Sequence, residues 1–189
     1  METTGRISIH KDKAMIGMEQ FHIRLLSRKD IEVLGDLYFP WSTKEETIAK
    51  WTRYLEEQQQ GIRKALVVLH EDEIVGYGHL LFCSEYPEFK NHNIPEIQDL
   101  WIFEGSRKKG IGSSLIRHLE KLAAEKGYKQ VGIGVGLYRD YGSAQKLYFR
   151  LGFAPDGYGI TYKHAPVVAG EKYSVDDDLI LWLTKHLSC

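Results

Sequence analysis

The sequence is poor in cysteine, with only Cys83 and Cys189, and it lacks repeats, low-complexity tracts and long apolar runs. Two cysteines make neither a disulfide framework nor a paired metal motif, which is typical of a reducing cytosol, and they leave open a single disulfide between them. No stretch approaches the ~20 apolar residues that span a bilayer, and the N-terminus has no signal-peptide core. We therefore expect a cytoplasmic protein without a membrane partner.

An excess of charge of one sign is also missing. Lys and Arg together number 25, against 26 for Asp and Glu, so the formal net charge is -1. So small a charge gives no general attraction for nucleic acid, and any anion must be bound locally. With 43% hydrophobic and 27% charged residues, the chain is typical of a globular protein. We expect a flexible arm over residues 1–18 and a single domain over residues 19–189.

Hydrophobic periodicity predicts an α/β fold with a mixed sheet. Two capping boxes, Ser27-x-x-Asp30 and Ser42-x-x-Glu45, predict the starts of two helices, which end before Pro40 and at Gly61. Their buried residues are expected to be Ile31, Leu34 and Tyr38 in the first helix and Ile48, Trp51 and Leu55 in the second. Two later helices are expected at 110–126 and 141–151, a loop at 85–95, and strands at 21–25, 64–70, 73–82, 96–103, 128–137, 159–164 and 178–187.

The most informative motif lies between the strand at 96–103 and the helix at 110–126. It reads Arg107-Lys108-Lys109-Gly110-Ile111-Gly112-Ser113. Its glycines leave the amides of the first helical turn accessible, and the helix dipole and three cations add attraction for an anion. The motif predicts a phosphate cradle, and it is not a Walker loop because no Gly-Lys-Ser/Thr occurs. A solvated basic turn is the alternative interpretation of this motif alone.

The cradle and a second motif together resemble the two sequence motifs of the GNAT superfamily of acyl-CoA-dependent N-acetyltransferases. The family's Arg/Gln-x-x-Gly-x-Gly/Ala motif is matched by Arg107, Gly110 and Gly112. Its short helix, which contains a tyrosine and closes on Gly-Phe, is matched by residues 144–153 with Tyr148. The resemblance spans roughly residues 20–187. It implies a largely antiparallel sheet of about six to seven strands, helices on both faces, and splayed central strands that hold CoA.

The resemblance also implies ligands and the residues that bind them. Acetyl-CoA is the expected acyl donor and a small-molecule or peptide amine the acceptor, no metal is expected, and a homodimer stays open. Strand amides near Leu100 and Trp101 are expected to hold the developing oxyanion. Tyr141 stands where many family members have an asparagine that bonds pantetheine. The residues implied in CoA binding are Leu100, Trp101, Ile102, Arg107, Lys108, Lys109, Gly110, Ile111, Gly112, Ser113 and Tyr141.

Three residues are candidates for the chemistry itself. By resemblance, Tyr148 protonates or hydrogen-bonds the departing CoA sulfur, whereas a tyrosine on an apolar helical stripe is otherwise core. An amine acceptor must lose a proton before it attacks, and Glu96 or Asp99 could take it, directly or through water. Glu96 stands eleven residues before Arg107, the spacing of the catalytic glutamate in the histone-acetylating branch of the family. Odd spacing places the two acids on opposite faces of a strand unless a bulge intervenes.

The strand 131–137 alternates glycine with aliphatic residues, so Gly132, Gly134 and Gly136 share one bare face. The group that approaches this face is either pantetheine or the acceptor, or it is a tightly packed helix. The eight histidines form no His-x-x-x-His or Cys/His cluster, and no Gly-x-Ser-x-Gly elbow occurs. Metal and serine-hydrolase chemistry are therefore without support.

These observations predict an acetyl-CoA-dependent N-acetyltransferase in which a primary amine attacks the thioester directly, without a covalent enzyme intermediate. Two alternatives stay open: a non-catalytic CoA-binding regulatory module, and an acyltransferase that uses another acyl-CoA. The acids Glu85, Glu88, Glu96 and Asp99 favour a cationic acceptor, unless they are simply solvated.

Overall fold

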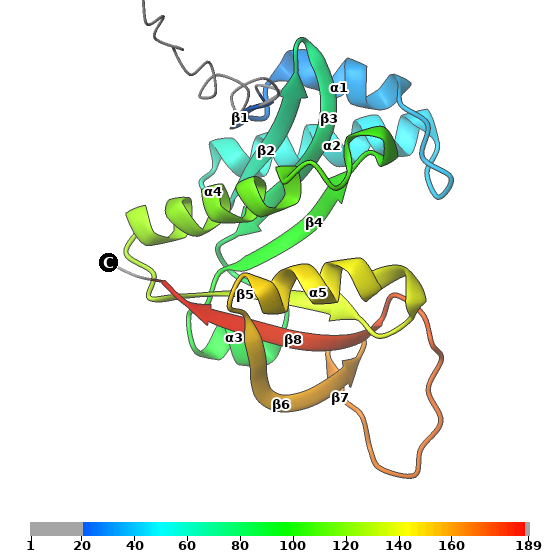
Figure 1. The fold of residues 1–189 in the computed structure, drawn as a ribbon, viewed down its shortest axis with the longest axis vertical. Coiled ribbons are helices and arrows are strands. Elements are labelled where there is room, and N and C mark those ends of the chain that lie inside the picture. The colour runs from blue at the N-terminus through cyan, green and yellow to red at the C-terminus, as the bar shows by residue number, and fades with distance from the viewer. Residues whose placement is uncertain (1–20, 188–189) are drawn as a thin grey trace, which may run out of the picture.

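The computed structural model describes residues 21–187, and the expected arm at 1–18 and Cys189 lie outside them. Within this part of the chain, eight strands form one sheet in the order β1-β2-β3-β4-β5-β8-β6-β7 (Figure 1). Neighbouring strands are antiparallel except β4 and β5, which are parallel. The mixed, mostly antiparallel sheet confirms the predicted fold class. The strands are β1 (Phe21–Leu25), β2 (Arg63–His70), β3 (Glu73–Leu81), β4 (Glu96–Ile102), β5 (Gln130–Gly136), β6 (Ala154–Tyr162), β7 (Ala165–Pro166) and β8 (Leu179–His186).

Helices cover both faces of the sheet, as Figure 1 shows. One face carries α4 and α5, whose apolar residues join a core with Ile97, Ile133 and Leu183 of the strands. The other face carries α1 and α2, which pack on Val67 and Tyr77. None of the helices within residues 21–187 is long and apolar enough to cross a membrane. The helices are α1 (Arg28–Asp36), α2 (Lys44–Gln59), α3 (Pro87–Asn91), α4 (Ile111–Glu125) and α5 (Gly142–Arg150), with short 3₁₀ turns η1 (Glu104–Ser106) and η2 (Arg139–Tyr141).

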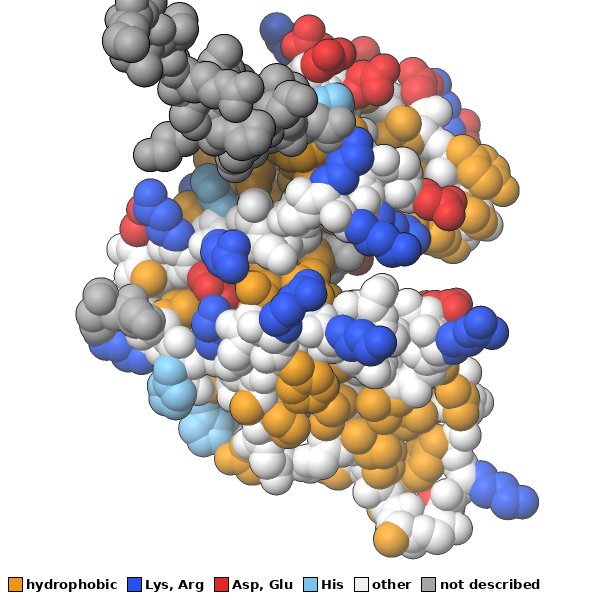
Figure 2. Space-filling view, viewed as in Figure 1, with side chains coloured by type: hydrophobic (Ala, Val, Ile, Leu, Met, Phe, Trp, Pro, Cys, Tyr) orange, Lys and Arg blue, Asp and Glu red, His pale blue; other side chains and the backbone are white. Residues whose placement is uncertain are grey.

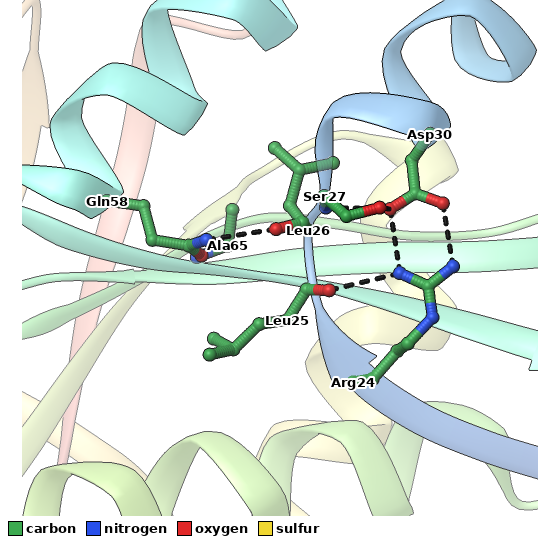
Figure 3. Close-up of polar contacts among 7 residues, drawn as sticks. All are labelled: Arg24, Leu25, Leu26, Ser27, Asp30, Gln58 and Ala65. Carbon is green, nitrogen blue, oxygen red and sulfur yellow. Dashed lines mark hydrogen bonds and ion pairs between the residues drawn. The ribbon is translucent and has the colours of Figure 1, made fainter.

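The predicted capping box at Ser27 is present and is part of a polar joint between β1 and the two helices (Figure 3). Both oxygens of Asp30 accept hydrogen bonds of 2.7 Å from the Arg24 guanidinium, and the Ser27 amide and hydroxyl donate to Oδ2. Burial alone would raise the pKa of Asp30, but Arg24 and Ser27 outweigh it and lower that pKa. Gln58 of α2 donates to the Leu26 carbonyl and accepts from the Ala65 amide, 3.0 Å in each case. Helices α1 and α2 are thus fixed to the sheet by satisfied polar groups as well as by apolar packing.

Several local predictions were wrong. The second capping box starts one residue later, at Thr43, where Glu46 bonds back to the Thr43 amide, because the Ser42 amide is already used in a turn to the Phe39 carbonyl. Tyr38 is 84% exposed, since α1 ends at Asp36 and Tyr38 no longer follows the helical period. The expected loop at 85–95 contains α3, whose Phe89 is buried. The strand missing from the prediction, β7, has two residues and is too short to show alternation.

Candidate active site

The two central strands β4 and β5 separate soon after they meet. Their parallel pairing covers only Glu96 with Gly132 and Ile97 with Ile133. Beyond that point β4 continues to pair with β3, and β5 continues to pair with β8 as far as Gly136. The splayed strands that the resemblance implied are therefore present. They leave the later part of β4 with one edge that has no neighbouring strand.

A β-bulge interrupts β4 at the position of its second acid. Gln98 pairs with His79 and Trp101 pairs with Tyr77, so two residues of β4 stand opposite one residue of β3. Asp99 takes a left-handed backbone conformation there, with φ of 49°. Side chains alternate between faces except across such a bulge, so Glu96 and Asp99 lie on the same face of the sheet. The sequence left open whether a bulge intervenes between the two acids. The structure has one, and it turns Asp99 towards α2.

The bulge also determines which β4 amides face the gap. The Phe103 amide donates to the Val75 carbonyl in β3 at 3.0 Å. Because amides alternate in direction along a strand, the Trp101 amide also faces β3, and the amides of Leu100 and Ile102 face the open edge. The expected oxyanion donors therefore differ in direction, and Leu100 is the one aimed at the gap. Leu100 and Ile102 pack towards α4, while Trp101 packs with α1 and α2.

Asp99 is held by three side chains that all reach the same oxygen, Oδ2. The Lys50 ammonium lies 2.5 Å from it, the Tyr54 hydroxyl donates to it at 3.1 Å, and His79 Nε2 lies 3.3 Å away, outside hydrogen-bond geometry. Burial alone would raise the pKa of Asp99, but His79 and Lys50 outweigh burial and lower it strongly. The side chain is 36% exposed, so this carboxylate stays ionised and faces solvent.

His79 is completely buried, and its protonation state follows from its neighbour. Arg63 lies 2.8 Å from His79 Nδ1. A guanidinium can only donate, so Nδ1 accepts and the ring proton is on Nε2, towards Asp99. Burial is also the main cause that lowers the pKa of His79, and it keeps the ring neutral. Arg63 in turn pairs with Glu57 of α2, which gives a polar row from Glu57 to Asp99 with Arg63 and His79 buried at its centre.

This row was not found from the sequence. Its members come from α2, β2, β3 and β4, and no motif links them. The one available signal was His79 itself, a histidine within the apolar run of β3 whose neighbours are all buried.

Glu96 has a different environment from Asp99. It is 5% exposed, and the Ser84 hydroxyl donates to its Oε2 at 2.5 Å. Burial raises the pKa of Glu96, and the hydrogen bonds from Ser84 and Gln98 only partly offset it. A carboxyl group with a raised pKa is a better proton acceptor near neutral pH than an ordinary one.

The predicted cradle lies at the start of α4. Gly110 precedes the helix with φ of 84°, and Lys108 also has positive φ, at 63°. The first bond of the helix runs from the Ser114 amide to the Gly110 carbonyl, so the amides of Ile111 and Gly112 come before the hydrogen-bonded turns. Apart from its chain neighbours, no heavy atom of residues 21–187 lies within 4 Å of the place where a Cβ on Gly110 would stand. The helix start is thus open to an anion.

Cations surround this opening. Figure 2 shows Lys and Arg side chains along the indentation between the part of the molecule built on α4 and the part built on α5. Arg107 is anchored in this region, since its Nε donates to the Ile102 carbonyl at 2.8 Å and its guanidinium lies 4.9 Å from the Trp101 ring. Its terminal nitrogens stay at the surface. The phosphates and pantetheine of CoA fit a site with this open helix start, these cations and the adjacent gap in the sheet.

Tyr148 lies on α5, close to the cradle. The preceding residue, Leu147, comes within 3.3 Å of an ideal Cβ on Gly112, so α5 packs against the first turn of α4. Tyr148 is 6% exposed, and burial raises the pKa of its phenol well above the ordinary value. Among residues 21–187 no group hydrogen-bonds its hydroxyl. The phenol therefore stays protonated and has a donor to offer.

Tyr141 is engaged by the protein itself. Its hydroxyl donates to Asp177 at 2.9 Å, and its ring covers Gly136, where a Cβ would come within 2.5 Å of ring atoms. The other glycines of this strand are covered in the same way, Gly132 by Phe89 of α3 and Gly134 by Trp182 of β8. Aromatic rings of the protein therefore cover the glycine face, and only one of them, Phe89, comes from an α-helix, so the expected packing of a helix accounts for one of the three positions. Within residues 21–187, no three metal-ligating side chains gather at one point.

Comparison with known proteins places the chain in a family. Residues 30–153, well over half of the chain, match the model of the acetyltransferase (GNAT) family. The chain therefore belongs to the GNAT acetyltransferase family, as its two motifs indicated. A search among curated proteins finds no match to this sequence.

Solved structures share the fold at low sequence identity. An N-acetyltransferase from Staphylococcus aureus Mu50 is 20% identical with a TM-score of 0.63, and the match covers 89% of this chain and 99% of that one. An acetyltransferase from Salmonella typhimurium that modifies the N-terminal serine of ribosomal protein L7/L12 is 14% identical, with a TM-score of 0.64 and coverage of 89% and 95%. Spermidine N-acetyltransferase from Vibrio cholerae, solved with CoA and spermine, is 16% identical, with a TM-score of 0.63 and coverage of 89% and 96%.

Proposed function

We propose that this protein transfers an acetyl group from acetyl-CoA to a primary amine, by direct attack of the amine on the thioester in a ternary complex. The observation that carries the proposal is the arrangement around the β4–β5 gap. The open start of α4 lies by one end of the gap, and two acids lie on one face of β4 beside it. Membership of the GNAT family and the CoA bound by the Vibrio cholerae enzyme support the choice of donor.

In this proposal the donor is bound mainly by backbone groups. The amides of Ile111, Gly112 and Ser113 receive the pyrophosphate, and Arg107 adds a charged contact. Acetyl-CoA supplies the activated acyl group. The Leu100 amide, aimed at the gap, is placed to hold the negative charge that develops on the carbonyl oxygen.

The two acids have different roles because their environments differ. Glu96, with its raised pKa, accepts the proton of the amine, directly or through water. Asp99 remains ionised and is a weak base, so its contribution is electrostatic. Tyr148 donates its hydroxyl proton or a hydrogen bond to the leaving sulfur, which departs more easily when neutralised.

The test is an assay of acetyl-CoA with a panel of primary amines, followed by release of free thiol and by mass spectrometry of the amine. The panel contains a monoamine, a polyamine, an amino acid, an aminoglycoside and a peptide with a free N-terminus. Thiol release that depends on one of these amines supports the proposal. Stabilisation by acetyl-CoA without thiol release from any amine contradicts it and favours a CoA-binding module.

A further inference from the structure

We infer that Asp99 is a binding site for the ammonium group of the acceptor, and that Lys50 fills this site until the acceptor displaces it. The inference deepens the proposed function, on which it rests. It assigns a ligand class, a primary ammonium ion, to one carboxylate. It also assigns to Lys50 the role of an exchangeable occupant.

The groups around Asp99 have the chemistry that recognises an ammonium ion. A carboxylate supplies the charge, and two aromatic rings stand beside the cation that now occupies the site. Lys50 Nζ lies 2.5 Å from Asp99 Oδ2, 5.6 Å from the Trp51 ring centroid and 5.5 Å from that of Tyr54. An anion flanked by aromatic faces is a typical ammonium site.

The three partners of Asp99 are not equivalent. His79 is completely buried and is held by Arg63, and Tyr54 is buried in the packing of α2 on the sheet. Lys50 is a third exposed, so its long side chain can leave without opening the core. It lines a pocket of about 590 Å³, together with aromatic residues that include Trp41 and Tyr77. Asp99 is not among the residues that line this pocket, but its side chain is 36% exposed, and Lys50 is the partner that a ligand arriving at this exposed side can replace.

The single charge of the carboxylate balances only one such cation. All three partners reach Oδ2, and none of the groups in residues 21–187 bonds Oδ1. A single negative charge next to two ammonium groups leaves an excess of positive charge, and the neighbouring Glu57 already pairs with Arg63. Like charges in contact repel, so the incoming ammonium replaces Lys50 and does not join it.

The position of Asp99 connects this site to the proposed reaction. The next residue, Leu100, has the amide that faces the gap between β4 and β5. An amine held at Asp99 is thus one residue away from the group proposed to hold the thioester carbonyl. The left-handed backbone at Asp99 is energetically costly for a residue other than glycine, and such costs are concentrated at functional sites.

The experiment measures ammonium binding without requiring turnover. Butylammonium chloride is titrated into the ¹⁵N-labelled full-length protein at constant ionic strength, and the Asp99 amide and His79 ring signals are followed by NMR. Butanol, which has the same body without charge, is the ligand control. We expect saturable shifts with butylammonium, none with butanol, and none in Asp99→Asn.

The decisive variant is Lys50→Met, with Lys50→Gln as a second, more polar version. Removal of the competing cation should tighten butylammonium binding roughly three- to fivefold, the factor expected for a partly exposed ion pair. Lys44→Met is the matched control, because Lys44 lies on the same helix and pairs with an aspartate, Asp36, away from the site. It should bind butylammonium as the parent does. Equal or weaker binding in both Lys50 variants overturns the inference.

Failure of this inference can be separated from failure of the proposed function. If amines are acetylated but the Lys50 variants bind butylammonium no more tightly, the enzyme stands and the ammonium site is rejected. If no amine is acetylated but the Lys50 variants bind more tightly, the site stands and the transferase proposal is rejected. Where both stand, Lys50→Met should lower the KM for the amine and leave the KM for acetyl-CoA unchanged.

Discussion

The two sides of the β4–β5 gap, which we propose bind the donor and the acceptor and call the donor side and the acceptor side, are built in opposite ways. On the donor side, the start of α4 presents backbone amides and surface cations, and Gly110 leaves the space above it open. On the acceptor side, Asp99 and Glu96 are already bonded by side chains from several elements. The donor side therefore fits a ligand shared by a whole family, because backbone geometry is independent of side-chain identity. The acceptor side depends on individual side chains and can differ between members.

We expect the largest effect from a substitution that disrupts the donor side alone. Gly112→Val introduces a branched side chain in the first turn of α4. Even its Cβ alone would come within 3.3 Å of the Leu147 side chain. At a hundred times its Kd, acetyl-CoA should stabilise the parent by about 2.7 kcal/mol, a thermal shift of roughly 5–10 °C. We expect the variant to lose this shift and its activity.

Ser114→Val is the control for this change. It adds a similar side chain to the same helix, but at an exposed position whose amide is already bonded to Gly110. It should keep the thermal shift. A normal shift with acetyl-CoA in a folded Gly112→Val variant would remove the cradle from the proposal.

The next effect concerns the leaving group. Tyr148→Phe keeps the buried ring and deletes a hydroxyl for which residues 21–187 supply no partner, so unfolding stability should change little. Loss of a general acid should lower kcat on the order of a hundredfold or more at every pH, with acetyl-CoA binding intact. Tyr128→Phe, a partly buried tyrosine stacked on Phe82, is the control and should keep its kcat. Unimpaired turnover in Tyr148→Phe would leave Tyr148 as a core residue.

The sequence predicts the structure of the donor side better than that of the acceptor side. The start of α4 and the helix α5 with Tyr148 lie in contiguous motifs, and contiguous residues determine their own local geometry, so the positions of both were predicted from residue order alone. The environment of Asp99 requires Lys50, His79 and a bulge, and it arises only when α2, β3 and β4 come together. Strict alternation of side chains would place Glu96 and Asp99 on opposite faces of β4. The one extra residue of the bulge places them on the same face.

Helix ends and short elements show the same limit. Ser42 and Thr43 are both suitable N-cap residues, and the turn that uses the Ser42 amide decides between them. The five-residue helix α3 is too short for periodicity to reveal, yet its Phe89 covers the Gly132 position of β5. The prediction that some group closely approaches the glycine face was therefore correct. Which groups cover it depends on the tertiary structure.

A smaller, pH-dependent effect tests the acceptor side. Glu96→Gln keeps an oxygen that can accept from Ser84 but cannot take a proton. Because the pKa of Glu96 is raised, its basic form appears only at a pH above the ordinary glutamate range. Between the raised pKa of Glu96 and the pKa of the amine, turnover should fall on the order of a hundredfold. The loss should shrink at lower pH, where Glu96 is itself protonated, and at high pH, where solvent deprotonates the amine.

The measurement for Glu96 is a pH profile of kcat/KM for the parent and the variant. The parent should show a limb that rises with pH through the raised pKa of Glu96, and the variant should lack this limb. Acetyl-CoA binding should be equal in both. Identical profiles would show that Glu96 is structural and that water carries the proton.

We expect the smallest effect from a substitution of Arg107. It separates the contribution of a side-chain charge to donor binding from that of the backbone amides at the start of α4. Arg107 is exposed, and its Nε is committed to the Ile102 carbonyl, so only its terminal nitrogens can reach a phosphate. An exposed charge pair contributes up to about 1 kcal/mol, which corresponds to roughly a fivefold change in affinity. Arg107→Ala should therefore raise the KM for acetyl-CoA a few-fold and leave the KM for acetyl-pantetheine, which has no phosphate, almost unchanged. Arg117→Ala, an exposed arginine further along α4, is the control and should change neither value. Equal losses for the two donors would assign Arg107 to the structure of the β4–α4 loop, and a loss as large as that of Gly112→Val would show that side-chain charge, not the helix start, binds the donor.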